Sequence, residues 1–97
     1  MHYLIELTYT VDLQAIDQHL QAHRQWLQLH YDLGHFVMAG AKQPRTGGLI
    51  LAHADDENTV LQWIAHDPFK QHGLAEYRVS AWHISTQHPE LVLPKAA

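Results

Sequence analysis

The sequence of 97 residues has no cysteine, few basic residues and no long apolar run. Without cysteine there is neither a disulfide framework nor a thiolate nucleophile, which agrees with a reducing compartment. The six lysine and arginine residues are scattered along a chain of net charge −4, whereas binding of nucleic-acid phosphates needs clustered cations. The apolar runs are too short to cross a bilayer, and the first residues do not have the pattern of a signal peptide. We therefore expect a cytoplasmic protein that binds neither nucleic acid nor membrane.

The composition is otherwise that of a compact domain, with a hydrophobic share of 46% and a charged share of 16%. A chain of 97 residues forms one core but buries only a modest fraction of its surface. No repeat or linker interrupts it, so we expect a single domain over residues 1–97 whose last part, residues 85–97, is an irregular tail. Ten histidines are the compositional oddity, and they are spread along the chain rather than gathered in a tag.

The spacing of apolar residues predicts the order of the secondary-structure elements. Alternation with a period of two indicates strands over residues 2–9, 35–39, 49–52 and 77–84. Helical periodicity indicates one long helix over residues 13–33 and a second helix that begins after Asp55 or Asp56 and stops near His66. The resulting order of strand, helix, strand, strand, helix, strand predicts an α+β fold of ferredoxin-like βαββαβ topology with a four-stranded antiparallel sheet.

Residues at the ends of these segments support the assignment. Asp12 is placed to cap the long helix with its carboxylate, and Gly34 suits a left-handed position after its last turn. Asp67 has the position of a cap for a short third helix, in which Pro68 is the first residue and Gly73 marks the end. The second helix has to stop ahead of Pro68, because the residue before a proline is disfavoured in a helix.

The predicted strands carry apolar residues on both faces. Neighbouring residues of this kind are Leu4 and Ile5, Val37 and Met38, and Ile50 and Leu51. Two helices cover only one face of a four-stranded sheet, so the other face needs a second covering layer. A second copy of the chain packed sheet to sheet is the economical solution, and it predicts a homodimer.

One histidine of the long helix, His23, lies where the apolar stripe calls for a leucine. The other members of that stripe are Leu13, Ile16, Leu20, Leu27 and Tyr31. In this fold both main helices lie on one side of the sheet, so Asp67 can approach His23. A carboxylate bonded to one imidazole nitrogen makes the other nitrogen a general base. The alternative is that both residues are only structural: Asp67 caps a helix and also accepts a hydrogen bond from a core histidine, His23. From the spacing alone, this arrangement is the more common one.

Several motifs resemble those of the YCII-related (YciI-like) family, in the family's order and from Tyr3 to Trp82. They are Ala22-His23-Arg24, Gly34-His35-Phe36-Val37-Met38-Ala39-Gly40, Pro44-Arg45-Thr46-Gly47-Gly48, Asp67-Pro68-Phe69 and Gly73-Leu74. The resemblance implies a dimeric α+β barrel, similar in fold to muconolactone isomerases, with His23 and Asp67 as the family's catalytic pair. One relative in this family removes chloride from a chlorinated, hydroxylated aromatic compound. The chain departs from the family at Gly40-Ala41, where Gly-Pro is frequent.

The glycine-rich loop between the second and third strands supplies three candidate substrate-binding residues: Lys42, Arg45 and Thr46. A guanidinium on a flexible loop is suited to hold a carboxylate or phenolate over the histidine. The alternative is that this loop is a solvated hairpin tip. For Arg24, next to His23, we expect an exposed helix residue or a salt-bridge partner.

The histidine content also raises the question of a metal. His19 and His23 lie four residues apart on one helix face, which is compatible with two ligands on one ion, and His30 follows further along. No HExxH pattern accompanies them, and we expect neither a functional metal site nor another cofactor.

These observations favour an enzyme that acts on a small, anionic or aromatic compound. His23 would exchange a proton with the substrate and Asp67 would orient it, which suits elimination, dehalogenation or isomerisation without a cofactor. The alternative from another class is a noncatalytic homodimeric module that binds a metabolite or a metal ion.

Overall fold

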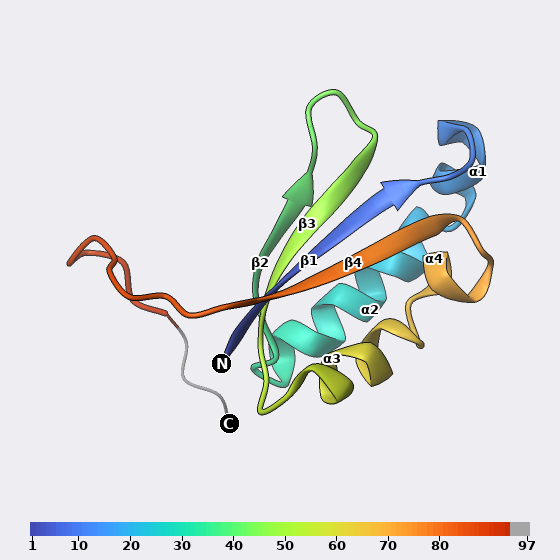
Figure 1. Cartoon of the computed structure of the whole chain (residues 1–97). Helices are drawn as coiled ribbons and strands as arrows, with labels where there is room; N and C mark the ends of the chain where they lie inside the picture. The colour runs from blue at the N-terminus through green and yellow to red at the C-terminus, as the bar shows by residue number, and fades with distance from the viewer. Residues whose placement is uncertain (94–97) are drawn as a thin grey trace.

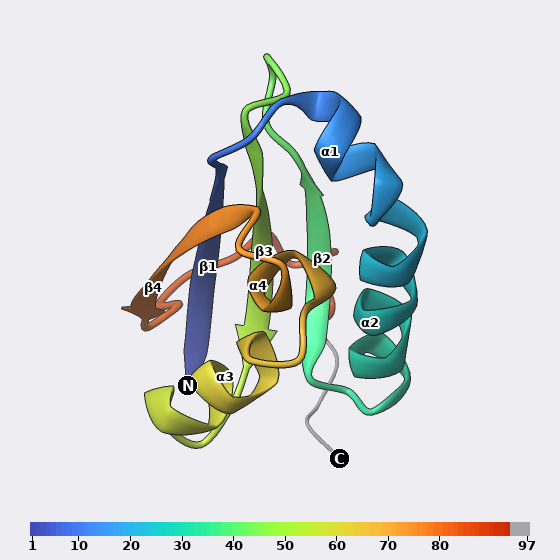
Figure 2. The same ribbon diagram turned by 90° about the vertical axis from the view of Figure 1, so that its right-hand side faces the viewer.

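The structure, a computed structural model, describes residues 1–93. Its elements are β1 (His2–Tyr9), α1 (Leu13–Gln18), α2 (Leu20–Asp32), β2 (Phe36–Ala41), β3 (Gly47–His53), α3 (Glu57–Ile64), α4 (Pro68–Gln71) and β4 (Ala75–Trp82). The strands pair in the order β2-β3-β1-β4, and every pair is antiparallel. All four helices lie on the same side of this sheet (Figures 1 and 2). The predicted ferredoxin-like α+β fold is confirmed.

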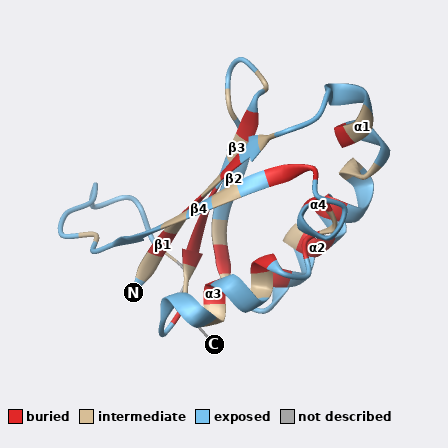
Figure 3. Cartoon of the chain, turned by 45° about the vertical axis from the view of Figure 1, so that its right-hand side comes forward, coloured by how far each residue is buried: buried red, intermediate tan, exposed pale blue. Residues whose placement is uncertain are grey.

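The core lies between the helices and the sheet face that they cover. On β1, Tyr3, Ile5 and Leu7 are buried on this face, as their alternation predicts. Ile5 pairs with Ile50 of β3 on one side and with Val79 of β4 on the other. The helices turn their buried residues toward this face and their exposed residues away from it (Figure 3). On this side of the sheet α2 and α4 contact each other.

The predicted long helix is wrong in one respect, because it is broken at His19. That residue leaves the helical conformation (φ −114°, ψ 6°), and its amide bonds to the carbonyl of Ile16, three residues earlier. The His19 ring stacks on the ring of His72 with 4.1 Å between centroids. Neither glycine nor proline marks the break, so helical periodicity alone did not reveal it.

The buried face of α2 is also rotated from the predicted stripe. Trp26 and His30, which the stripe did not include, are buried beside His23, and the first member of the stripe, Leu13, lies on α1 and is 41% exposed. The Trp26 indole donates to the backbone carbonyl of Trp63 over 3.0 Å, which satisfies its N–H inside the core. The predicted apolar residues Leu20, Leu27 and Tyr31 are half-buried at the margin of the core.

The helix ends agree with the predicted caps. The carboxylate of Asp12 accepts from the amide of Ala15 over 2.9 Å, and Asp56 rather than Asp55 caps α3. Gly34 and Gly73 have φ angles of 77° and 66°, a left-handed conformation that glycine adopts without steric cost. The strand boundaries differ from the prediction by a few residues, most visibly in β4, which begins at Ala75.

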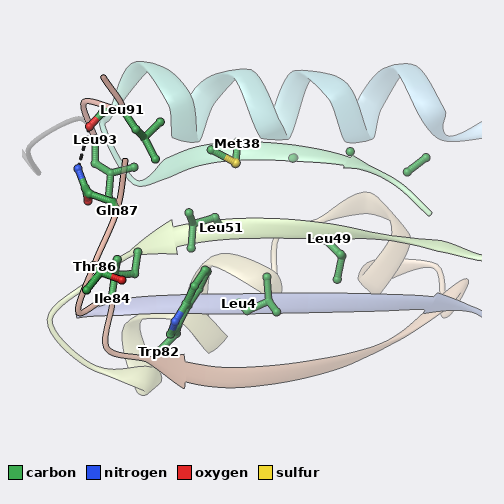
Figure 4. A pocket seen from close by; sticks show the side chains of 13 residues that line it. Leu4, Met38, Leu49, Leu51, Trp82, Ile84, Thr86, Gln87, Leu91 and Leu93 are labelled. Atoms are coloured by element: carbon green, nitrogen blue, oxygen red, sulfur yellow. Dashed lines mark hydrogen bonds between the residues drawn. The ribbon is translucent and has the colours of Figure 1, made fainter. Parts of the chain in front are cut away.

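The chain continues from β4 as an irregular tail that leaves the body of the domain (Figure 1). Residues 85–93 contain neither helix nor strand, and the last part of the predicted tail, residues 94–97, lies outside the described residues. Part of this segment borders the sheet face opposite the helices, where a strongly apolar cavity of about 600 Å³ lies (Figure 4). Leu4, Leu51 and Trp82 of the sheet and Leu91 of the tail are among its lining residues. Within residues 1–93 no helix is long and apolar enough to cross a membrane.

Candidate active site

The structure brings His23 and Asp67 together. Nδ1 of His23 lies 2.8 Å from Oδ1 of Asp67, although the two residues are 44 positions apart in the chain. His23 is one turn into α2, and Asp67 is the residue that caps α4. Asp67 is fully buried and His23 is 9% exposed. Since a carboxylate only accepts hydrogen bonds, the Nδ1 atom carries the proton in this pair, and Nε2 is the basic nitrogen.

The Asp67 carboxylate has more than one donor. Its Oδ1 also accepts from the Phe69 amide over 3.1 Å, which is the capping bond of α4. Its Oδ2 accepts from the Tyr77 hydroxyl of β4 over 2.5 Å. Burial and the negative charge of Asp67 both raise the pKa of Tyr77, so the phenol stays protonated and can donate. Tyr77 was not among the predicted site residues, although its alternation placed it on a strand.

The His23 ring is held in place by aromatic neighbours. It stacks on Phe69 with 4.1 Å between centroids and 6° between planes. Trp26 lies on the same helix with its ring centroid 5.6 Å away. Within residues 1–93, Nε2 of His23 has no hydrogen-bond partner. This leaves one fixed imidazole nitrogen for a ligand.

A cavity of about 240 Å³ lies beside His23, between α2 and the strands β1, β2 and β3. Its wall on α2 includes the half-buried residues of the predicted stripe, and its wall on the sheet combines larger side chains with several small residues. The lining residues are Leu7, Tyr9, Leu20, His23, Arg24, Leu27, Tyr31, Ala39, Gly40, Ala41, Gly48, Leu49 and Ile50. Because Ala39, Ala41 and Gly48 fill so little space on the sheet, the room under α2 stays open.

The three predicted loop residues make other contacts. Lys42 pairs with Glu6 over 2.8 Å, and this bond lowers the pKa of Glu6. Arg45 pairs with Asp17 of α1 over 2.5 Å, and this bond raises the pKa of Arg45. The Thr46 hydroxyl donates to the carbonyl of Pro44. None of the three is among the residues that line the cavity beside His23, whereas Arg24 is.

Six of the ten histidines lie in close pairs. The close pairs are His19 with His72, His30 with His35, and His2 with His53. In the part of the chain that the structure describes, no group of three or more histidine, aspartate or glutamate residues is arranged to hold a metal ion. His23, the residue that would share a metal with His19, directs Nδ1 to Asp67 instead.

The comparisons with known proteins agree with this fold. A structure of 5-chloro-2-hydroxyhydroquinone dehydrochlorinase from Burkholderia phenoliruptrix AC1100, in complex with 2,5-dihydroxybenzoquinone, is similar to this chain with a TM-score of 0.76. The two sequences are 21% identical, over 86% of this chain and 94% of the other, so the likeness bears on the fold. Among curated proteins no sequence matches this chain. The pattern of the YCII-related domain matches residues 1–83, and the chain therefore belongs to the family of YCII-related domains.

Proposed function

We propose that this protein is an enzyme in which His23 transfers a proton to or from a small ring compound and Asp67 orients His23. The observation that carries the proposal is the 2.8 Å bond between His23 and Asp67 at the edge of a cavity of about 240 Å³. A buried aspartate, a fixed imidazole and adjacent open space are the parts that general acid–base catalysis needs. The similar fold of a dehydrochlorinase adds support for chemistry on a hydroxylated ring.

The proposed step uses the protonation state that Asp67 imposes. Nε2 of His23 accepts a proton from a substrate carbon or hydroxyl group, and Asp67 stabilises the imidazolium that forms. The electron pair left on the substrate forms a double bond. In elimination or dehalogenation a leaving group such as chloride departs, and in isomerisation the imidazolium returns its proton to another atom. His23 and Asp67 carry out this chemistry without a redox or group-transfer cofactor.

The cavity supports a ligand of one ring with a polar or anionic group. Most of its lining is apolar, and Tyr9, Tyr31 and Arg24 supply polar groups around His23. Arg24 is suited to hold a phenolate or carboxylate. We retain Lys42, Arg45 and Thr46 as proposed substrate-binding residues, but they reach a ligand beside His23 only if the loop moves and the pairs with Glu6 and Asp17 open.

The proposed assembly is a homodimer through the sheet face that the helices leave uncovered. That face holds the apolar cavity of Figure 4, bordered by Trp82, which is half-exposed. The prediction is a dimeric mass in solution for the wild type and a shift toward monomer for Trp82→Glu. Leu61→Glu, which changes an equally exposed residue on α3, serves as the matched control and should leave the mass unchanged. A monomeric wild type would contradict this assembly.

The function is tested by screening chlorinated hydroquinones, hydroxybenzoquinones and lactones for turnover, with chloride release as one readout. A substrate found with the wild type is then given to His23→Gln and to Leu61→Gln, whose side chain lies away from the cavity. We expect His23→Gln to lose activity and Leu61→Gln to keep it. Equal activity of His23→Gln and wild type would overturn the proposal. Stoichiometric ligand binding without turnover would favour the noncatalytic binding module.

A further inference from the structure

Tyr77 connects the sheet to the proposed catalytic pair. It lies on β4, opposite Leu7 of β1, and points to the side of the sheet that the helices cover. Its hydroxyl donates to Oδ2 of Asp67, while His23 donates to Oδ1 of the same carboxylate. The contact thus joins three elements at one side chain, because His23 belongs to α2, Asp67 caps α4 and Tyr77 belongs to β4.

We infer that Tyr77 is a positioning residue: its hydrogen bond to Oδ2 fixes the Asp67 carboxylate so that Oδ1 stays aligned with Nδ1 of His23. This inference rests on the proposed function of His23 and Asp67. A carboxylate is held more firmly against rotation about its Cβ–Cγ bond when both of its oxygens are hydrogen-bonded than when only one is. The Phe69 amide and His23 hold only Oδ1, so the Tyr77 hydroxyl is the contact that holds Oδ2 within residues 1–93.

The surroundings of Tyr77 keep its hydroxyl protonated, so that it can donate a hydrogen bond. Burial, followed by the charge of Asp67, raises its pKa, and Tyr9 of β1 acts in the same direction. The ammonium group of Lys70 lies over the Tyr77 ring, 5.7 Å from its centroid, and adds a contact that holds the ring. Without this hydroxyl, Oδ2 of a fully buried carboxylate would have no partner, which is costly in a protein interior.

The inference predicts a spectroscopic effect of Tyr77→Phe, which removes only the hydroxyl. In the wild type, nitrogen NMR of the His23 side chain should show a proton on Nδ1 that exchanges slowly with water. In Tyr77→Phe we expect that proton to exchange about tenfold faster or more, since a hydrogen bond to a charged group has been lost. The matched control is Tyr3→Phe, which removes a hydroxyl from the same sheet face away from Asp67. If Tyr77→Phe kept the wild-type tautomer of His23 and the wild-type exchange rate of its Nδ1 proton, the inference would be wrong.

A second variant covers the case in which Tyr77→Phe does not fold. Site-specific 3-fluorotyrosine at position 77 retains the hydroxyl and makes it a stronger donor, so the Nδ1 proton of His23 should exchange more slowly than in the wild type. No change, or faster exchange, would contradict the inference.

These spectra need no substrate, which separates this inference from the proposed function. If the spectra respond as expected but His23→Gln retains full activity, the positioning role stands and the catalytic role fails. If a substrate is turned over by the wild type, Tyr77→Phe should lower kcat and change KM little, because Tyr77 acts through Asp67 and not on the ligand. An unchanged kcat would count against Tyr77 as a positioning residue.

Discussion

Two buried histidines of α2, two turns apart on the same side of the helix, have opposite surroundings. His23 bonds to the carboxylate of Asp67 and borders a cavity. His30 is 6% exposed, and its Nδ1 lies 2.9 Å from Nδ1 of another histidine, His35. Three aromatic rings surround His30, those of Trp26, Phe36 and Trp63.

The comparison shows how the neighbours of a side chain decide its chemistry. A carboxylate stabilises the protonated imidazole, so His23 is equipped to accept and return a proton. Burial lowers the pKa of His30 to about 4, and the nearby His35 and His66 act in the same direction. His30 is therefore neutral near pH 7 and acts as a core residue. The proposed proton transfer therefore falls to His23, whereas His30 packs in the core.

The largest predicted difference between the two histidines is in activity. Replacing His23 by Gln should lower kcat/KM on a substrate of this protein by a factor of about 10² to 10⁴, the usual contribution of a general acid–base group. His30→Phe keeps an aromatic ring in an aromatic environment and should change kcat/KM by less than about threefold. Kinetics on both folded variants measure the difference. If kcat/KM fell by a similar factor in both variants, His23 and His30 would not differ in their contribution to activity.

The partner of His23 should also contribute strongly to stability. Asp67→Ala removes the cap of α4 and leaves Nδ1 of His23 and the Tyr77 hydroxyl without their acceptor, so we expect a loss of about 2–4 kcal/mol in the free energy of unfolding. Asp56→Ala removes the exposed cap of α3 and serves as the matched control, with a clearly smaller loss. Urea denaturation at pH 7 measures both. Equal losses would mean that Asp67 acts as a cap and nothing more.

The surroundings of His30 predict a pH dependence. Its pKa falls from 6.5 when unfolded to about 4 when folded, so the folded state binds its proton less readily. The stability that neutral His30 contributes is present above pH 6.5 and is lost as the pH falls toward 4. Over this window we expect the wild type to lose about 2–3 kcal/mol more than His30→Phe in urea titrations at several pH values. Parallel losses in both proteins would show that another group is responsible.

The smallest predicted effect concerns Arg24, the cation that lines the cavity beside His23. Arg24→Gln should weaken the binding of an anionic ring compound such as deprotonated 2,5-dihydroxybenzoquinone by about tenfold, because one charge-assisted hydrogen bond is lost. Arg45→Gln, whose side chain pairs with Asp17, should weaken it less. Calorimetric titration compares the two. A greater loss in Arg45→Gln would indicate that the loop closes over the ligand, as the sequence suggested.

Much of the fold followed from the sequence, because its signals are local. Alternation in β1, the capping carboxylates and the glycines at the helix ends each depend on a few neighbouring residues. The pairing of His23 with Asp67 was also accessible, since the cap position of Asp67 and the topology together restrict where its carboxylate lies.

Other features depend on how distant segments pack, and periodicity did not reveal them. Tyr77 reaches Asp67 only because the register of β4 places it on the helix side, beside α4. The burial of His30 depends on aromatic residues from β2 and α3. The cavity is lined in part by the small residues Ala39, Ala41 and Gly48, and small residues in a strand carry no signal of empty space.

The central claim is that a ring compound binds beside His23 and exchanges a proton with it. A crystal structure of the protein soaked with 2,5-dihydroxybenzoquinone or a small aromatic acid tests this most directly. We predict density for the ring between α2 and the β2–β3 hairpin, with a polar atom within about 2.6–3.2 Å of Nε2 of His23. Density only on the apolar sheet face around Leu4 and Trp82, with the space beside His23 empty, would contradict it.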